Sequence, residues 1–261
     1  MISRERARSF DAWAADYDRF RPGYPVVLFD EIAERLELPE RPRVADLGAG
    51  TGLASLAMAL RGWRVTAVEP GAPMLDVLRE RAIAQGHAVA SVQAGAEDTT
   101  LETASVDLVT AAQAFHWFDH ATAVPEMARI TRPGGGLALF WNVRDAASSD
   151  LLAAYNALFD SYGIGVDSRL PGRNPSTSAR IAASGAFEPS GFFQVRHTQV
   201  LDRDGFIGLA HTKSYVRALA PERLARFTHD LDELLDRHMP PRGRLEVPYI
   251  VDCEIARRKD R

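Results

Sequence analysis

The stretch that decides the fold is VADLGAGTGL, residues 44–53. A short apolar run precedes Gly48, Gly50 and Gly52, and apolar residues at helical spacing follow them. Glycine adopts the backbone conformations that tight turns need, so this order predicts a buried strand, a glycine turn and the start of a helix. Asp46 lies at the end of this strand, and Glu69 ends the next apolar run. This layout suits a cofactor that carries a nucleoside.

Short apolar runs alternate with helical patterns on both sides of this turn. We expect strands over 44–47, 65–68, 88–92, 106–111 and 137–141, with two later strands over 192–201 and 247–255. Such alternation is typical of a parallel sheet with helices on both faces, and it places the glycine turn at the carboxyl edge, where ligands bind. The sequence therefore predicts an α/β fold: a Rossmann-like, doubly wound, mostly parallel sheet of about seven strands.

We expect one domain over residues 1–261, built from four parts. These are an N-terminal helical cap (1–40), a cofactor-binding core (41–144), an inserted lid (145–190) and C-terminal strands and helix (191–261). Helical patterns over 9–20 and 26–36, separated by Pro22 and Pro25, indicate the cap. A helical pattern over 151–162, followed by a stretch rich in glycine, proline, serine and asparagine, indicates the lid.

Composition narrows the class of protein. Lys plus Arg total 31 and Asp plus Glu total 35, so the net charge of -4 gives no electrostatic reason to expect nucleic acid or an anionic membrane as partner. Cys253 is the single cysteine, which excludes an internal disulfide and a cysteine-based zinc site, and the histidines show no metal-ligand spacing. No signal-peptide core or apolar run of ~20 residues is apparent. We expect a cytoplasmic protein without a metal.

The glycine spacing separates two classes of cofactor. The dinucleotide fingerprint is G-x-G-x-x-G, whereas this chain reads G-x-G-x-G and has Leu53 at the third dinucleotide position. Asp46 would also repel a pyrophosphate. S-adenosylmethionine carries an ammonium, a carboxylate and a ribose but no phosphate. Asp46 suits its cationic part, directly or through water, and Glu69, about 20 residues later, suits both ribose hydroxyls.

Five segments resemble, in order, the class I S-adenosylmethionine-dependent methyltransferases. They are DLGAGTG at 46–52, VEP at 68–70 with Met74 and Leu75, GAED at 95–98, SVDLV at 105–109 and RPGG at 132–135. Any one segment is weakly specific, and the ordered set is strongly so. The chain departs from a common pattern of the family at Gly95, where many relatives are acidic, and at Thr99 and Thr100, which replace a usual apolar-proline pair.

The resemblance implies a cofactor site. Glu69 would bind the ribose diol, the glycine turn would lie against the methionine part, and residues 96–97 would meet the adenine edge. The residues assigned to cofactor binding on this basis are Tyr17, Arg21, Asp46, Gly48, Ala49, Gly50, Glu69, Pro70, Met74, Ala96, Glu97 and Gln113.

The segment AAQAFHWFD, residues 111–119, and N-terminal residues 10–25 together resemble the branch that contains trans-aconitate methyltransferase and similar small-molecule enzymes. By that resemblance Tyr17, Arg21 and Tyr24 close over the cofactor, and the Arg21 fork is a candidate for its carboxylate. Alternatively, the two tyrosines staple the N-terminal helices and Arg21 forms a surface salt bridge. His116 is the candidate catalytic residue, as a general base or a group that orients the acceptor. The alternative is a structural histidine bonded to backbone.

These observations predict in-line methyl transfer from S-adenosylmethionine to an oxygen of a small molecule, either a carboxylate or a hydroxyl. A carboxylate is ionised at pH 7 and needs no base, whereas a phenol or alcohol would benefit from His116. Four arginines, namely Arg144, Arg169, Arg173 and Arg180, could pair with an acidic substrate or stay solvated. Methyl transfer to nitrogen, carbon or RNA, a nicotinamide oxidoreductase and a non-catalytic cofactor-binding scaffold are the alternatives. The acceptor and the oligomeric state stay open.

Overall fold

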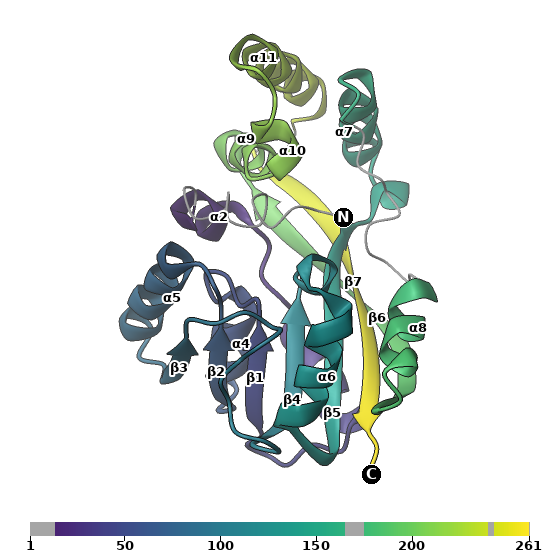
Figure 1. The fold of residues 1–261 in the computed structure, drawn as a ribbon. Helices are drawn as coiled ribbons and strands as arrows, with labels where there is room; N and C mark the ends of the chain where they lie inside the picture. Colours follow the sequence, from purple (N-terminus) through teal and green to yellow (C-terminus); the bar gives the residue numbers. More distant parts are fainter. Residues whose placement is uncertain (1–13, 165–174, 240–242, 261) are drawn as a thin grey trace.

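The computed structural model describes residues 14–164, 175–239 and 243–260. In these ranges the strands form one seven-stranded sheet in the order β3-β2-β1-β4-β5-β7-β6, with helices on both faces (Figure 1). The strands are β1 Arg43–Leu47, β2 Arg64–Val68, β3 Val89–Val92, β4 Val106–Ala112, β5 Thr131–Arg144, β6 Phe187–Leu201 and β7 Leu245–Arg258. β1 to β5 pair in parallel, and β7 pairs antiparallel with β5 and β6. The expected Rossmann-like, mostly parallel sheet is confirmed.

The central strands are apolar on both faces because helices cover both. Consecutive side chains of a strand point to opposite faces, so Leu139 packs in the cluster under α6 (His120–Ile130) and Phe140 packs in the cluster under α3 (Val26–Arg35) and α4 (Leu53–Leu60). Trp141 packs in the same cluster as Leu139, and Met58 and Trp63 pack in the same cluster as Phe140. These two layers hold the carboxyl edge of β1 and β2 in a fixed position.

The remaining helices are α2 Ala14–Phe20, α5 Ala72–Ala84, α7 Asp150–Ser161, α8 Pro175–Ala183, α9 Arg203–His211, α10 Ser214–Arg217 and α11 Pro221–His238. Residues 9–13 of the expected N-terminal helix lie outside the described residues. Within the described residues, every helix is too short or too polar to cross a membrane.

Two strands begin earlier than the sequence pattern predicts. β5 begins at Thr131, which pairs with Val106, so the proline and glycines at 133–136 belong to a strand and do not form a loop. β6 begins at Phe187 and passes through an irregularity in register between Pro189 and Gly191. A β-bulge admits proline and glycine into a strand, and for this reason the sequence pattern places both boundaries too late.

Beyond the carboxyl edge, the long strands β5, β6 and β7 rise past the rest of the sheet and carry a second group of helices (Figure 1). Tyr155 and Phe159 of α7, Phe206 of α9 and Phe227 of α11 pack there with Tyr249 of β7. α8 instead packs against β6, where Ile181 joins the core of the sheet. The two helices of residues 145–190 therefore lie in different parts of the fold, and their role as a lid stays a prediction.

Candidate active site

The glycine turn between β1 and α4 lies at the carboxyl edge of the sheet. Its backbone is tied to the end of β2, because the N–H groups of Gly48 and Ala49 donate to the carbonyl of Val68 at 2.8 and 3.2 Å. A Cβ atom on Gly48, at φ 66°, would lie 2.6 Å from the Cβ of Ala114, whereas one on Gly50, at φ 56°, would meet nothing within 4 Å. The backbone of Gly50 therefore borders open space, which gives a ligand room to approach it.

Glu69 follows β2 and reaches back to this turn. Its Oε2 accepts a hydrogen bond from the N–H of Gly50 at 2.9 Å, and its Oε1 accepts one from the N–H of Gly71 at 2.9 Å. The side chain is thus fixed beside the open space at Gly50.

Asp46 supports the turn from inside the protein. It is fully buried, and its Oδ2 and Oδ1 accept hydrogen bonds from the hydroxyls of Ser55 at 2.6 Å and Thr110 at 2.8 Å. Burial raises the pKa of Asp46 to about 6, although the two hydroxyls act in the opposite direction. Because Asp46 is 0% exposed, direct contact with a cofactor would require this carboxylate to become accessible. Its action on a cofactor through water or through its charge stays a prediction.

The aromatic-histidine segment lies against the turn, as its position after β4 predicts. Ring atoms of Phe118 lie 3.3 Å from where a Cβ of Gly48 would be, and Phe115–Trp117 forms a short 3-10 turn, η2. The segment is also tied to residues 95–98, because Glu97 Oε1 accepts the N–H of Asp119 at 2.9 Å. Ala96 is buried in the core of the sheet. The candidate adenine edge and the candidate acceptor segment therefore form one surface.

His116 lies within this segment in an environment that disfavours its charged form. Burial, with a smaller effect from His120, lowers its pKa to about 4, so the imidazole is neutral at pH 7. Its Nδ1 is buried and has no hydrogen-bond partner among the described residues. By contrast, Nε2 of His120 lies 3.0 Å from the carbonyl oxygen of Phe115. Of the two histidines, His120 is the one seen bonded to backbone.

The N-terminal helix α2 is held over the glycine turn. Asp18 forms an ion pair with Arg81 of α5, and Arg81 also donates to the carbonyl of Thr51. Arg21 follows α2 and donates through Nη2 to the carbonyl of Thr212 at 2.9 Å, with its guanidinium 4.9 Å from the centre of the Tyr17 ring. The structure therefore shows Arg21 engaged by a carbonyl and a ring.

Tyr24 packs edge-on against Phe140, with ring centres 4.9 Å apart. Burial raises the pKa of Tyr24, and the nearby Tyr17 and Asp46 add to that effect. Tyr17 and Tyr24 therefore lie together above the buried Asp46.

Gln113 directly follows β4 and has a backbone conformation that is uncommon for a residue other than glycine, at φ 56°. Its N–H donates to Phe140 and its Nε2 donates to the carbonyl of Asn142, at 2.9 and 3.0 Å. Such conformations cluster at functional sites. Pro70 is exposed directly after Glu69, and Met74 is buried in α5. The structure thus gathers the predicted cofactor residues around one edge of the sheet.

Comparisons with known proteins identify the family. A family model described as a methyltransferase domain matches residues 45–139. An uncharacterized methyltransferase of Mycobacterium tuberculosis is 36% identical over 257 residues, which cover 97% of each chain. The chain belongs to the class I S-adenosylmethionine-dependent methyltransferases. The resemblance found in the sequence is therefore confirmed, and the protein is an enzyme.

This methyltransferase is also similar to a named enzyme and to a solved structure. A malonyl-[acyl-carrier protein] O-methyltransferase from Serratia marcescens is 35% identical over 134 residues, 49% of each chain. A solved structure from Anaeromyxobacter dehalogenans, assigned as a type II methyltransferase, has a TM-score of 0.66 and 28% identity and covers 92% of this chain and 98% of that one.

Sequence reasoning missed several residues that build the methyltransferase site. Ser55 and Thr110 hold Asp46, and the signal for both is a lone hydroxyl inside an otherwise apolar helix or strand. Asn142 was also missed. Its Nδ2 donates to the carbonyl of Gly23 at 3.1 Å, and its Oδ1 lies 2.7 Å from His197 Nε2, so it joins the N-terminal cap to the sheet. No local pattern marks such a long-range contact.

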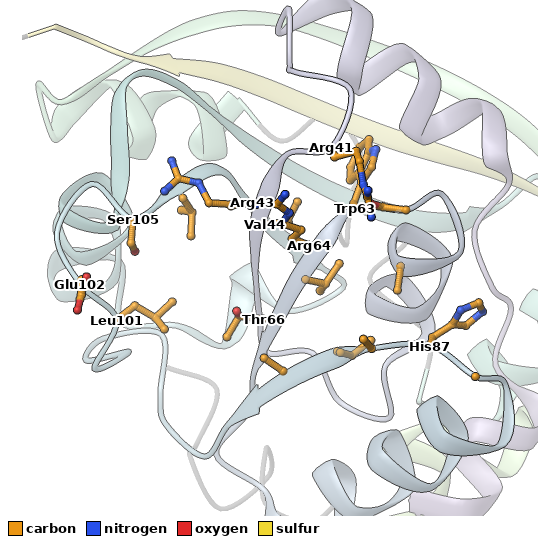
Figure 2. A pocket seen from close by; sticks show the side chains of 18 residues that line it. Arg41, Arg43, Val44, Trp63, Arg64, Thr66, His87, Leu101, Glu102 and Ser105 are labelled. Carbon is orange, nitrogen blue, oxygen red and sulfur yellow. The ribbon is translucent and has the colours of Figure 1, made fainter.

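A hollow of about 810 Å³ lies at the opposite edge of the sheet of this methyltransferase (Figure 2). It is lined by the amino ends of β1 and β2, including Arg43 and Arg64, and by Arg41 and His87. Nε of Arg43 forms an ion pair with Oδ2 of Asp107 at 3.2 Å. Ligands of open α/β folds bind at the carboxyl ends of the strands, so we place the active site at the other edge. No set of three or more metal-ligating side chains gathers within the described residues.

Proposed function

We propose that this methyltransferase binds S-adenosylmethionine over the carboxyl ends of β1 and β2 and transfers its methyl group to an oxygen of a small molecule. The observation that carries the proposal is the Glu69 carboxylate, fixed by the N–H groups of Gly50 and Gly71 beside open space. A ribose diol is a pair of donors that such a carboxylate can accept. Membership of this family supports S-adenosylmethionine as the methyl donor.

The other predicted residues fit around this anchor. Gly48, Ala49 and Gly50 present backbone to the methionine part, Ala96 and Glu97 border the adenine, and Pro70 and Met74 flank the ribose. Tyr17 and Arg21 cover the cofactor from α2, and Gln113 and His116 face the acceptor. The open position at Gly50 and the buried, unpartnered Nδ1 of His116 support this assignment.

The bound cofactor supplies an electrophilic methyl group, so the protein has to align the acceptor and exclude water. Alignment of this kind contributes about 7–11 kcal/mol in favourable cases. His116, neutral and with a pKa of about 4, is a weak base toward an alcohol or phenol. We therefore favour a carboxylate as the acceptor, with His116 orienting it. The similarity to an enzyme named as an O-methyltransferase supports oxygen as the acceptor atom.

Isothermal titration calorimetry with S-adenosylmethionine and with its product S-adenosylhomocysteine tests the cofactor assignment. Binding of both supports the proposal, and absence of binding contradicts it. Release of labelled methyl product in a metabolite screen separates an enzyme from a non-catalytic scaffold. Salt-sensitive binding of RNA would instead favour the nucleic-acid alternative.

A further inference from the structure

A group of cationic and phenolic side chains lies beyond the carboxyl edge, between the sheet and the upper helices. We name it the cation-tyrosine cluster, and its members are Arg21, Arg144, Lys213, Tyr155, Tyr215 and Tyr249. They come from six places in the chain: the end of α2, the end of β5, the turn between α9 and α10, and α7, α10 and β7. Apart from Lys213 and Tyr215, which are two residues apart, these places are separated in the sequence, and the fold brings them together.

Arg144 is the centre of the cation-tyrosine cluster. It lies opposite Tyr249 in the β5–β7 pairing, and its guanidinium is 5.1 Å from the centre of the Tyr155 ring. The Tyr215 hydroxyl is within hydrogen-bonding reach of the same guanidinium. Its Nη2 also makes a long contact, 3.4 Å, with Asn156 Oδ1. All of these partners are uncharged.

The three cations of the cluster lie close enough to repel one another. Burial, followed by the charges of Arg21 and Arg144, lowers the pKa of Lys213 well below its usual value. Among the described residues, no carboxylate forms an ion pair with Arg21, Arg144 or Lys213. Charged side chains are rarely buried without an opposite charge, because desolvation is costly. Within the described residues, the positive charge of the cluster is therefore not balanced by an ion-paired carboxylate.

Several donors in the cluster also lack acceptors. The hydroxyl of Tyr155 and the Nε atoms of Arg21 and Arg144 are buried without hydrogen-bond partners in the described structure, and Tyr155 is 0% exposed. Buried polar groups are almost always paired, so three unpaired donors, two of them on the arginines, indicate a missing acceptor. An oxyanion satisfies both needs, since it brings charge and accepts hydrogen bonds from guanidinium and hydroxyl groups.

The cofactor alone does not supply this charge. S-adenosylmethionine carries a sulfonium and an ammonium against one carboxylate, so it is a net cation near pH 7. Even with its carboxylate on Arg21, it would increase the positive charge of the site. Arg21 and Asp46 both lie near Tyr24, and Arg21 also lies near Lys213, so the cation-tyrosine cluster borders the proposed cofactor site. Within the described residues no ion-paired carboxylate balances the cluster, so we take the methyl acceptor as the source of negative charge.

We propose that the cation-tyrosine cluster binds an oxyanion of the methyl acceptor, a carboxylate or a phosphate, through Arg144, Lys213 and the Tyr155 hydroxyl. The substrate is thus an anion that is anchored in the cluster while its reacting oxygen faces the methyl group. This assignment rests on the proposed function, and it names the class of substrate that the site accepts.

The test is calorimetric titration of glutarate, inorganic phosphate and the neutral glutaramide into the protein saturated with S-adenosylhomocysteine. Arg144→Gln and Lys213→Met remove cluster charges, and Tyr155→Phe removes only the unpaired hydroxyl. Arg196→Gln is the matched control, because Arg196 lies on β6 with a side chain that is 79% exposed. Titration of S-adenosylhomocysteine alone reports whether each variant keeps its fold and its cofactor site.

We expect wild type and Arg196→Gln to bind at least one anion and not glutaramide. Arg144→Gln and Lys213→Met should weaken anion binding by about tenfold or more, with the affinity for S-adenosylhomocysteine within about twofold of wild type. Tyr155→Phe should weaken it by less and keep the melting temperature of the ligand-free protein. Glutarate binding alone identifies a carboxylate, and phosphate binding alone identifies a phosphate.

Three results would overturn the assignment: no anion binding by wild type, equal binding of glutaramide, or anion affinities in Arg144→Gln and Lys213→Met equal to those of Arg196→Gln. Failure of wild type to bind S-adenosylhomocysteine is a different result. It contradicts the proposed function. Titration of the same anions into the ligand-free protein then tests the cation-tyrosine cluster separately.

Discussion

Glu69 and Gly50 are joined by a hydrogen bond of 2.9 Å between a carboxylate oxygen and a backbone N–H. This bond links the ends of β1 and β2, so the carboxylate and the turn form one rigid unit. The same Gly50 borders open space, whereas its neighbour Gly48 is packed against Ala114. The unit therefore has a closed side that faces the core and an open side at Gly50 that leaves room for a ligand.

Because Gly48 is packed and Gly50 is open, we predict that alanine impairs stability at the first position and ligand binding at the second. Gly48→Ala places a Cβ 2.6 Å from another Cβ at φ 66°, and it should reduce the free energy of unfolding by about 2–4 kcal/mol through overpacking and backbone strain. Gly50→Ala adds only strain, about 1 kcal/mol, and should weaken S-adenosylhomocysteine binding because its methyl group fills the ligand space. Urea unfolding and calorimetry measure the two effects.

Gly62→Ala is the control for Gly50→Ala. Gly62 has φ 81°, and a Cβ added to it would meet nothing within 4 Å, but it lies at the other edge of the sheet. Both substitutions should cost similar stability, and only Gly50→Ala should lose cofactor affinity. Equal affinity in the two variants would place the ligand elsewhere.

Asp46 predicts a specific pH dependence of stability. Its pKa is about 6 in the folded protein and about 3.9 when unfolded, so folding favours its protonated form. A raised pKa contributes stability that is fully present below the unfolded value and is lost as the pH rises through the folded value. The difference of about two units corresponds to about 3 kcal/mol. Wild type should lose this stability between about pH 4 and 7 relative to Asp46→Asn, which does not titrate.

Urea unfolding of both proteins at several pH values checks this prediction. The substitution itself can change the free energy of unfolding by a constant amount. Only the change with pH in the difference between wild type and Asp46→Asn reports the titration of Asp46. Parallel stability curves would show that Asp46 has the same pKa in both states, and a wild type that gains on the variant as the pH rises would show that folding lowers this pKa; either result contradicts the prediction.

His116 should titrate far below neutrality. Burial lowers its pKa to about 4, so its ring resonances in an NMR titration should show a midpoint near that value, with His116→Gln identifying the signal by its loss. The pH profile of methyl transfer should then show no change from His116 between about pH 6 and 8. A midpoint near the ordinary value of about 6.5 would restore His116 as a general base toward a hydroxyl.

For Glu126 we predict the opposite dependence of stability on pH. Hydrogen bonds from Arg129 and Thr99 lower its pKa to about 2. A lowered pKa gives stability that is present above the unfolded value of about 4.3 and is lost as the pH falls through the folded value. Wild type should therefore lose about 3 kcal/mol relative to Glu126→Gln between about pH 5 and 2. Urea unfolding of both proteins over that range measures it, and a constant difference would contradict it.

Much of the cofactor half could be predicted from sequence because its signals are local. The glycine turn, Asp46 and Glu69 lie within 24 residues of each other in a regular alternation of strand and helix, and the structure has the predicted elements there. The acceptor half could not be predicted in the same way. Arg144 ends β5 and Lys213 follows α9, which packs against β6, so residues far apart in sequence meet through the fold. Such long-range contacts leave no periodic pattern.

The central claim is that Glu69 anchors S-adenosylmethionine. Its most direct test is calorimetric titration of S-adenosylhomocysteine into wild type, Glu69→Ala and Glu80→Ala, where Glu80 is an exposed residue of α5 whose substitution removes the same charge. We predict tight binding by wild type and Glu80→Ala and an affinity at least about tenfold lower for Glu69→Ala, the loss expected for charged hydrogen bonds. Equal affinities in all three proteins would contradict the account.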